Sequence, residues 1–183
     1  LHPFPPRRAS DLAEAIFDVN DRIEEHSPEW ADFFVEALSE FIVHGTPPVG
    51  YVDETQADWL MAHIDRDGKL ESMAELELLV KLLERAIGAP ERLRDYAIAQ
   101  IEKAVLTGEG PTRRGDGLHH GAITDTEAQL LRRLIFAPAS DRPAGVSRAE
   151  AELLFRLKDA TLDAANGPEW KRLFVQGVGN YLM

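Results

Sequence analysis

The sequence predicts an all-α protein: a bundle of about eight helices, built from a degenerate three-helix repeat with EF-hand-like helix-loop-helix turns. Two observations predict this fold class. Apolar residues recur every three or four positions along nearly the whole chain of 183 residues, which is the period of an amphipathic helix. Alternating runs of β-branched residues bounded by turn residues, which would indicate strands, do not appear.

The expected helices are defined by their apolar stripes and by signals at their ends. In chain order they lie near residues 9–26, 29–44, 54–64, 72–88, 91–106, 124–136, 147–165 and 169–182. Residues 1–8 are rich in proline, which fixes the φ angle and lacks a backbone N–H, so we expect an extended arm there. The remainder, 9–183, is expected to form a single helical domain, because a chain of this length matches roughly one domain.

Several helix ends carry recognisable signals. Three helices begin with a Pro-Glu pair, at residues 28–29, 90–91 and 168–169. Proline in the first turn loses no hydrogen bond, and glutamate there suits the positive end of the helix dipole. Gly45 and Gly108 follow helices as C-caps. Two pairs have the spacing of a capping box: Thr124 with Glu127, and Ser147 with Glu150.

An internal repeat organises these helices. One helix type, with acidic, apolar and polar residues in the same order, is found at residues 14–21, 77–84 and 152–159. A second helix type, which begins with a Pro-Glu pair, follows each of these three helices. A third helix type follows the first two copies of the second type, at residues 52–60 and 123–131. The repeat units are expected to span about 9–71, 72–146 and, as a partial unit, 147–183. We expect the shared apolar stripes to form the core, since packing supplies most helical stability.

The charge of the chain is strongly acidic and is unevenly distributed. The formal net charge is −12, and residues 1–89 carry all of it, because residues 90–183 contain 13 acidic and 13 basic residues. A nucleic-acid partner is not expected, since it would need a basic face. No run reaches the roughly 18–20 apolar residues of a membrane span, and no signal peptide is visible, so the cytoplasm is the default expectation. We expect a protein partner or self-association, with a basic partner on the first unit.

The turn after the third expected helix contains candidate metal ligands. When Gly68 is placed at position 6 of a calcium EF-hand loop, Asp65 and Asp67 fall at positions 3 and 5, and Glu71 falls at position 9. Glu75 lies one residue beyond position 12. A degenerate site of Asp65, Asp67, Glu71 and Glu75 is therefore predicted, with Ca²⁺ or another divalent cation as its cofactor. The alternative is a tight turn in which aspartate and glycine satisfy local backbone groups.

A second loop offers weaker alternatives. Residues 116–127 fit the same calcium template with fewer acidic ligands, and the adjacent His119 and His120 could hold zinc together with Asp116. Cysteine is absent, so disulfides, thiolate metal sites and cysteine nucleophiles are excluded.

The turn pattern resembles the helical domain of tellurite-resistance TerB-type proteins and, more distantly, EF-hands. The resemblance rests on Asp-Arg-Asp-Gly-Lys-Leu at 65–70 with Glu75, and on the segments 123–127 and 146–150, within about residues 45–165. It implies an all-helical bacterial protein with an acidic, metal-linked surface.

No catalytic motif is present: GxGxxG, GxxxxGK[ST], GxSxG and HExxH are all missing. The sequence therefore predicts a non-catalytic helical module that binds a partner or acts as a scaffold. The alternative is a degenerate EF-hand-like or TerB-like domain that binds a divalent cation. An enzyme would need buried histidines or carboxylates that share a cleft.

Overall fold

The structure, a computed structural model, describes residues 7–113, 121–139 and 145–183. The described residues form eight α-helices, one short 3₁₀-helix and no strand, so the all-α prediction is confirmed. The elements are α1 (Arg7–Arg22), α2 (Pro28–His44), α3 (Glu54–Ile64), α4 (Met73–Arg85), α5 (Glu91–Thr107), η1 (Pro111–Arg113), α6 (Asp125–Ile135), α7 (Arg148–Ala160) and α8 (Pro168–Leu182).

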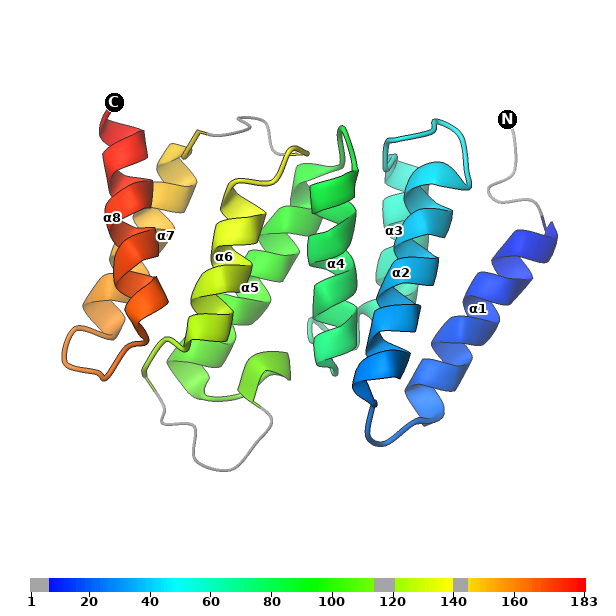
Figure 1. The fold of residues 1–183 in the computed structure, drawn as a ribbon, viewed down its shortest axis with the longest axis horizontal. Coiled ribbons are helices and arrows are strands. Elements are labelled where there is room, and N and C mark those ends of the chain that lie inside the picture. Colours follow the sequence, from blue (N-terminus) through cyan, green and yellow to red (C-terminus); the bar gives the residue numbers. More distant parts are fainter. Residues whose placement is uncertain (1–6, 114–120, 140–144) are drawn as a thin grey trace.

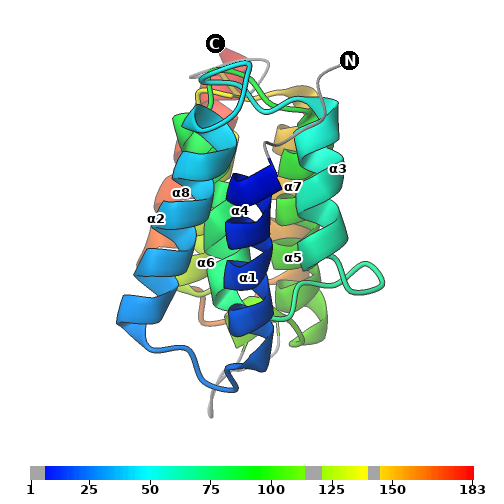
Figure 2. The same cartoon turned by 90° about the vertical axis from the view of Figure 1, so that its right-hand side faces the viewer.

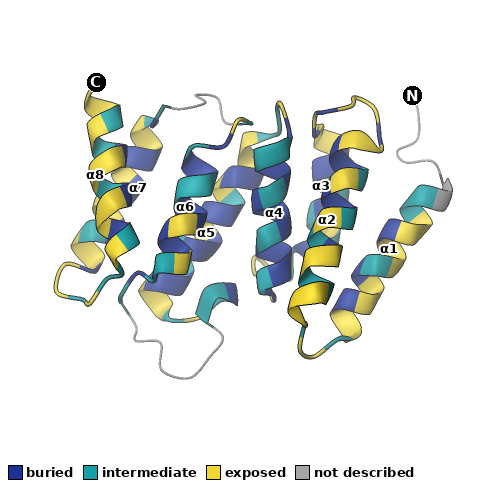
Figure 3. Ribbon diagram, in the orientation of Figure 1, coloured by how far each residue is buried: buried dark blue, intermediate teal, exposed yellow. Residues whose placement is uncertain are grey.

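The helices lie side by side, in chain order from α1 at one end to α7 and α8 at the other (Figure 1). Seen from the α1 end, α2, α6 and α8 lie on one side and α3, α5 and α7 on the other, with α1 and α4 between them (Figure 2). α4 packs against α2, α5 and α6. It shows mostly buried and intermediate residues, whereas α1 and α8 show many exposed ones (Figure 3). The three-helix repeat stays a prediction from the sequence.

Three helices, α1, α4 and α7, end earlier than the periodicity predicts. α4 stops at Arg85 because Ala86 is extended and the Ile87 N–H donates to the Gly50 carbonyl at 2.7 Å. α7 stops at Ala160, where the Thr161 hydroxyl donates to the Leu157 carbonyl and so takes up a helix-end acceptor.

The first helix also differs from its expected bounds. α1 begins at Arg7, within the segment expected to be an extended arm, and residues 1–6 lie outside the described part. It ends at Arg22, and the His26 ring lies 3.0 Å from the Asn20 carbonyl. The Asn20 side chain turns inward and accepts a hydrogen bond from the Trp30 indole at 3.1 Å. This bond connects the end of α1 to the start of α2.

One hydrophobic cluster contains buried residues from all eight helices. Phe17 anchors α1 to this cluster. Its ring meets Phe34 and Trp59 edge-on, at centroid distances of 5.4 and 5.7 Å, and stacks on His63 at 4.7 Å. Such aromatic pairs add stability beyond the area they bury.

Four helices begin with a capping box. In this motif the side chain of the residue before the helix accepts a hydrogen bond from the N–H of the third helical residue, and the side chain of that third residue accepts one from the N–H of the residue before the helix. The two expected pairs, Thr124 with Glu127 and Ser147 with Glu150, are confirmed at α6 and α7. The structure adds two more: Asp53 with Gln56 at α3, and Ser72 with Glu75 at α4. The side chains of Gln56, Glu75, Glu127 and Glu150 are all buried, so each of these helix starts turns its third residue toward the interior.

Glu127 is the most completely paired of these carboxylates. Its side chain is 0% exposed, and that of Arg113 is 2% exposed. Arg113 Nη2 donates to Oε2 at 2.8 Å, and the Thr124 N–H donates to the same oxygen at 3.0 Å. The Thr112 hydroxyl donates to Oε1 at 2.7 Å. Removing one partner of a buried ion pair leaves the other charge uncompensated, which is strongly destabilising.

We therefore predict that Glu127→Gln lowers the free energy of unfolding by about 3 kcal/mol or more, because Arg113 stays buried without its counter-charge. Urea denaturation at neutral pH measures this loss. Glu25→Gln, at an exposed position, is the control and should stay within about 0.5 kcal/mol of the wild type. Equal stability of the two variants would contradict the prediction.

Candidate functional site

The segment between α3 and α4 holds the four residues that the sequence singles out as metal ligands. Asp65 follows the last residue of α3, and its Oδ1 accepts hydrogen bonds from the Gly68 N–H at 2.9 Å and from the Tyr96 hydroxyl at 2.8 Å. Asp67 and Gly68 have φ angles of 55° and 81°. This left-handed pair closes a tight turn, and glycine adopts such a conformation at no steric cost.

Helix α5 holds this turn in place. The Gln100 amide donates to the Gly68 carbonyl at 3.0 Å, and its oxygen accepts from the Leu70 N–H at 3.1 Å. Tyr96 lies one helical turn before Gln100, so both residues present their polar groups to the same loop. Burial raises the pKa of the Tyr96 hydroxyl, and its hydrogen bond to Asp65 raises the pKa further.

The four predicted ligands have different surroundings. The Asp65 carboxylate takes part in the turn, and Glu75 belongs to the α4 capping box, whereas Asp67 and Glu71 are exposed. In the ranges that the structure describes, no three His, Asp or Glu side chains gather closely enough to hold a metal ion. The observed hydrogen bonds match the tight-turn alternative. Asp116, His119 and His120, the possible zinc ligands, lie outside the described residues.

Glu75 is buried without a close counter-charge. Its side chain accepts hydrogen bonds from the N–H groups of Glu71 and Ser72, both at 3.1 Å. No base in the described part of the chain lies within ion-pair distance of it. Burial raises the pKa of the carboxyl above its ordinary value of 4.5, and the two backbone hydrogen bonds only partly oppose this shift.

A groove between α2 and α4 is the second candidate site, with a volume of about 440 Å³. Its apolar lining comes from Ala31, Val35, Met73 and Ala74. Its charged lining consists of Asp32, Glu36, Glu77, Lys81 and Arg133, and His26 also lines it.

Most charges around the α2–α4 groove are already paired. Arg133 binds Glu77 at 2.9 Å and Glu84 at 2.8 Å, and these contacts raise its pKa. Arg85 binds Glu36 at 2.5 Å and holds the pKa of that carboxyl below its ordinary value. Asp32 is exposed, and no described base lies within ion-pair distance of it. Lys81, on α4, likewise has no described acid within ion-pair distance, so the groove combines an apolar lining with one unpaired carboxylate and one unpaired ammonium group.

The sequence did not reveal the α2–α4 groove. Most of its lining residues come from α2 and α4, which α3 separates in the chain, and Arg133 comes from α6. Periodicity alone does not predict which helices pack together. The small side chains of Ala31 and Ala74 were available as a signal, since they leave space between two helices.

Comparisons of the chain with protein-family models, with curated proteins and with solved structures were negative. No match is found. The resemblance to TerB-type proteins therefore stays a prediction from the sequence. None of the helices in the described part of the chain has the length and apolar character needed to cross a membrane.

The environment of Glu75 predicts an unusual response to Glu75→Gln. Because the native state raises its pKa, the wild type loses stability as the pH rises from 4.5 through the native pKa of Glu75. Glutamine can cap a helix at this position, as Gln56 does at the start of α3. We predict that Glu75→Gln is at least as stable as the wild type at pH 7, and that any advantage shrinks as the pH falls toward 4.5.

Urea denaturation across this pH range tests the prediction. Glu127→Gln, the same substitution at the same helical position of α6, is the matched control. It should be destabilised at pH 7, because Glu127 has Arg113 as a buried partner. A loss of the same size in both variants would show that the difference in charge pairing has no effect.

Proposed function

We propose that this chain is a non-catalytic helical binding module whose ligand is a basic, amphipathic protein segment bound in the α2–α4 groove. The observation that supports the proposal most directly is the groove itself, which leaves apolar side chains accessible within the acidic half of the chain. Asp32, whose carboxylate has no described base within ion-pair distance, lines this groove.

The physical chemistry of the groove suits such a ligand. Apolar side chains of an incoming helix would cover Val35 and Met73, which releases water from apolar surface. Lysine or arginine on the same segment would face Asp32 and the excess negative charge of residues 1–89. Opposite charges of this kind speed association and discriminate against acidic partners.

The charges around the groove support a binding role rather than a chemical one. Arg133 and Arg85 bind the neighbouring glutamates, so their positive charge is neutralised within the protein. A catalytic site needs groups that stay available to a substrate.

We predict that Val35→Lys weakens binding of a synthetic amphipathic helix, with leucine on one face and lysine on the other, by about tenfold or more. The variant removes an apolar contact and adds a like charge, and tenfold corresponds to about 1.4 kcal/mol. Fluorescence anisotropy of the labelled peptide measures the affinity.

Val175→Lys on α8 is the matched control, because Val175 is exposed at the other end of the array. It should bind the peptide as the wild type does. A peptide with glutamate in place of lysine should bind weakly to all three proteins. Equal affinity of Val35→Lys and Val175→Lys would overturn the proposal, since the peptide would then bind without using the groove.

We propose the divalent-cation domain as the alternative function. The exposed carboxylates of Asp67 and Glu71 on a left-handed turn support it. Binding to the native state must raise stability, so this alternative predicts a higher Tm in millimolar calcium than in chelator. The increase should disappear in Asp67→Asn. An unchanged Tm of the wild type would exclude a calcium site at this turn.

A further inference from the structure

The last two helices of the array expose an aromatic pair whose counterpart in the first two helices is buried. Phe155 on α7 and Phe174 on α8 meet edge-on, with ring centroids 5.4 Å apart and an angle of 84° between the ring planes. Phe17 on α1 and Phe34 on α2 meet at the same distance, 5.4 Å, and at 88°. In the sequence repeat, Phe155 corresponds to Phe17 and Phe174 to Phe34. The two pairs therefore match in both sequence position and geometry.

The two aromatic pairs differ in what covers them. Phe17 is 2% exposed and Phe34 0%, whereas Phe155 is 44% exposed. The first pair is covered by α3, whose Trp59 ring meets Phe17 at 5.7 Å and whose His63 ring stacks on Phe17 at 4.7 Å. Among the described residues, no ring from a third helix contacts the second pair. The face that α3 covers at the start of the array is therefore open at its end.

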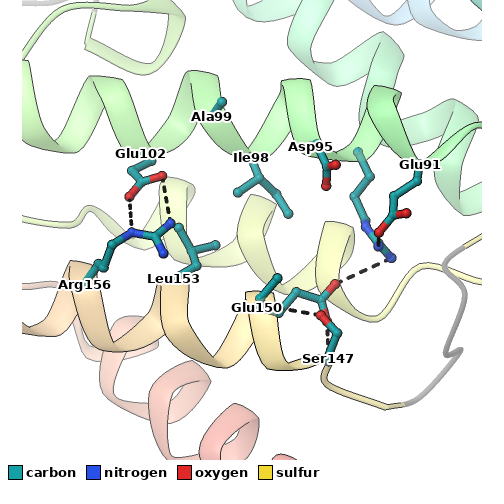
Figure 4. Close-up of a pocket in the computed structure, with 11 residues that line it drawn as sticks. Glu91, Asp95, Ile98, Ala99, Glu102, Ser147, Glu150, Leu153 and Arg156 are labelled. Atoms are coloured by element: carbon teal, nitrogen blue, oxygen red, sulfur yellow. Dashed lines mark hydrogen bonds and ion pairs between the residues drawn. The ribbon is translucent and has the colours of Figure 1, made fainter.

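The exposed pair lies on the side of α7 that is not used for packing on α5. Figure 4 shows Glu150, Leu153 and Arg156 turned toward α5, where Arg156 binds Glu102 at 3.0 Å. Phe155 lies about 200° around the helix from Leu153, since each residue turns an α-helix by about 100°. Because α7 and α8 form the end of the array (Figure 1), another molecule can reach this side.

A pocket of about 520 Å³ adjoins the exposed pair and carries positive charge. Trp170 and Phe174 supply its aromatic lining. Lys158 and Lys171 also line it, and no acidic side chain of the described residues does. Lys158 contacts the adjacent Asp159 at 3.0 Å, whereas Lys171 has no described acid within ion-pair distance. We call this pocket and the exposed aromatic pair the α7–α8 face.

The helix that covers the first pair has a charge that would suit the α7–α8 face. α3 contains two acidic residues, Glu54 and Asp58, and no lysine or arginine. It also carries the large ring of Trp59 on the side that contacts Phe17. An acidic amphipathic helix with a tryptophan is thus complementary, in shape and in charge, to an apolar pocket with two lysines.

We propose that the α7–α8 face binds an amphipathic helix of a partner protein, and that this helix carries a tryptophan on its apolar side and carboxylates beside it. The tryptophan would enter the pocket and cover Phe155 and Phe174. The carboxylates would face Lys158 and Lys171. This surface prefers the opposite charge to the α2–α4 groove, and the inference does not depend on the function proposed for that groove.

A labelled peptide with the sequence of residues 52–65 tests this proposal. It contains the whole of α3, with four acidic residues and no lysine or arginine. We expect fluorescence anisotropy to show saturable binding of this peptide to the full chain. Replacing Trp59 of the peptide by leucine should weaken binding about tenfold, because the pocket then receives no ring. The peptide of leucine and glutamate has the charge but no ring, so it should bind weakly here as well.

Two pairs of variants locate the peptide on the protein. Phe155→Glu should weaken binding about tenfold or more, since it removes an apolar contact and adds a like charge. Phe33→Glu on α2 is the matched control, because Phe33 is 51% exposed, and it should bind as the wild type does. Lys171→Glu should also weaken binding, and Lys171 is exposed, so this variant should fold normally. Lys69→Glu, at an exposed position before α4, is its control.

Three results would overturn the proposal: no saturable binding at millimolar peptide, equal affinity of Phe155→Glu and Phe33→Glu, or equal affinity of Lys171→Glu and Lys69→Glu. Equal affinities would mean that the peptide binds elsewhere, for example by displacing α3. Sedimentation of the wild type provides a fourth test. A dimer that Phe155→Glu abolishes would make a second copy of this chain the occupant and would overturn the assignment to a separate partner. The α2–α4 groove is lined by other residues, so none of these results bears on the peptide binding proposed there.

Discussion

The need to satisfy buried carboxylates at helix starts is the constraint on which the packing of this array depends. α4, α6 and α7 each place a glutamate at the third helical position and then bury it. A buried carboxylate must receive hydrogen bonds or a counter-charge. Two of these starts receive a base from another element: η1 supplies Arg113 to Glu127, and α5 supplies Arg94 to Glu150. Glu75 receives hydrogen bonds from the backbone N–H groups of Glu71 and Ser72 instead. α3 meets the same need with a neutral side chain, since Gln56 donates to the Ile42 carbonyl at 3.1 Å.

The need to pair buried polar groups also applies to the backbone of the loops, and it connects helices of the array across these loops. Polar side chains from α5 reach the turn before α4, where Gln100 binds the backbone of Gly68 and Leu70. Asn166 acts in a similar way, because its side chain accepts from the Ile123 N–H at 2.8 Å just before α6. Loop backbone is costly to bury unless its polar groups are paired. These contacts allow the two connecting segments to lie against the core.

Local sequence signals predicted the helices well but not their partners. The capping boxes at Thr124 and Ser147 were recognisable because their two members lie three residues apart in the chain. The box at Ser72 was missed because the calcium-loop alignment assigned Glu71 to the liganding position and left Glu75 one residue late. Arg113 and Arg94 could not be assigned to Glu127 and Glu150, because these contacts join separate elements. The α2–α4 groove depends on the same long-range packing, which periodicity does not specify.

The structure also sharpens the meaning of the uneven charge. Bases of the neutral second half reach back to acids of the first: Arg92 binds Glu54 and Asp58, and Arg133 binds Glu77 and Glu84. Part of the formal charge of residues 1–89 is therefore neutralised at α3 and α4. No base in the described ranges lies within ion-pair distance of four exposed acids around the end of α1 and the start of α2: Asp18, Glu24, Glu25 and Asp32. The uncompensated charge therefore gathers at the α1–α2 end of the array, and Asp32 brings it to the rim of the apolar groove. In the proposed function, a basic segment would be attracted to this end before any apolar contact forms, so the acidity and the groove would serve the same binding event.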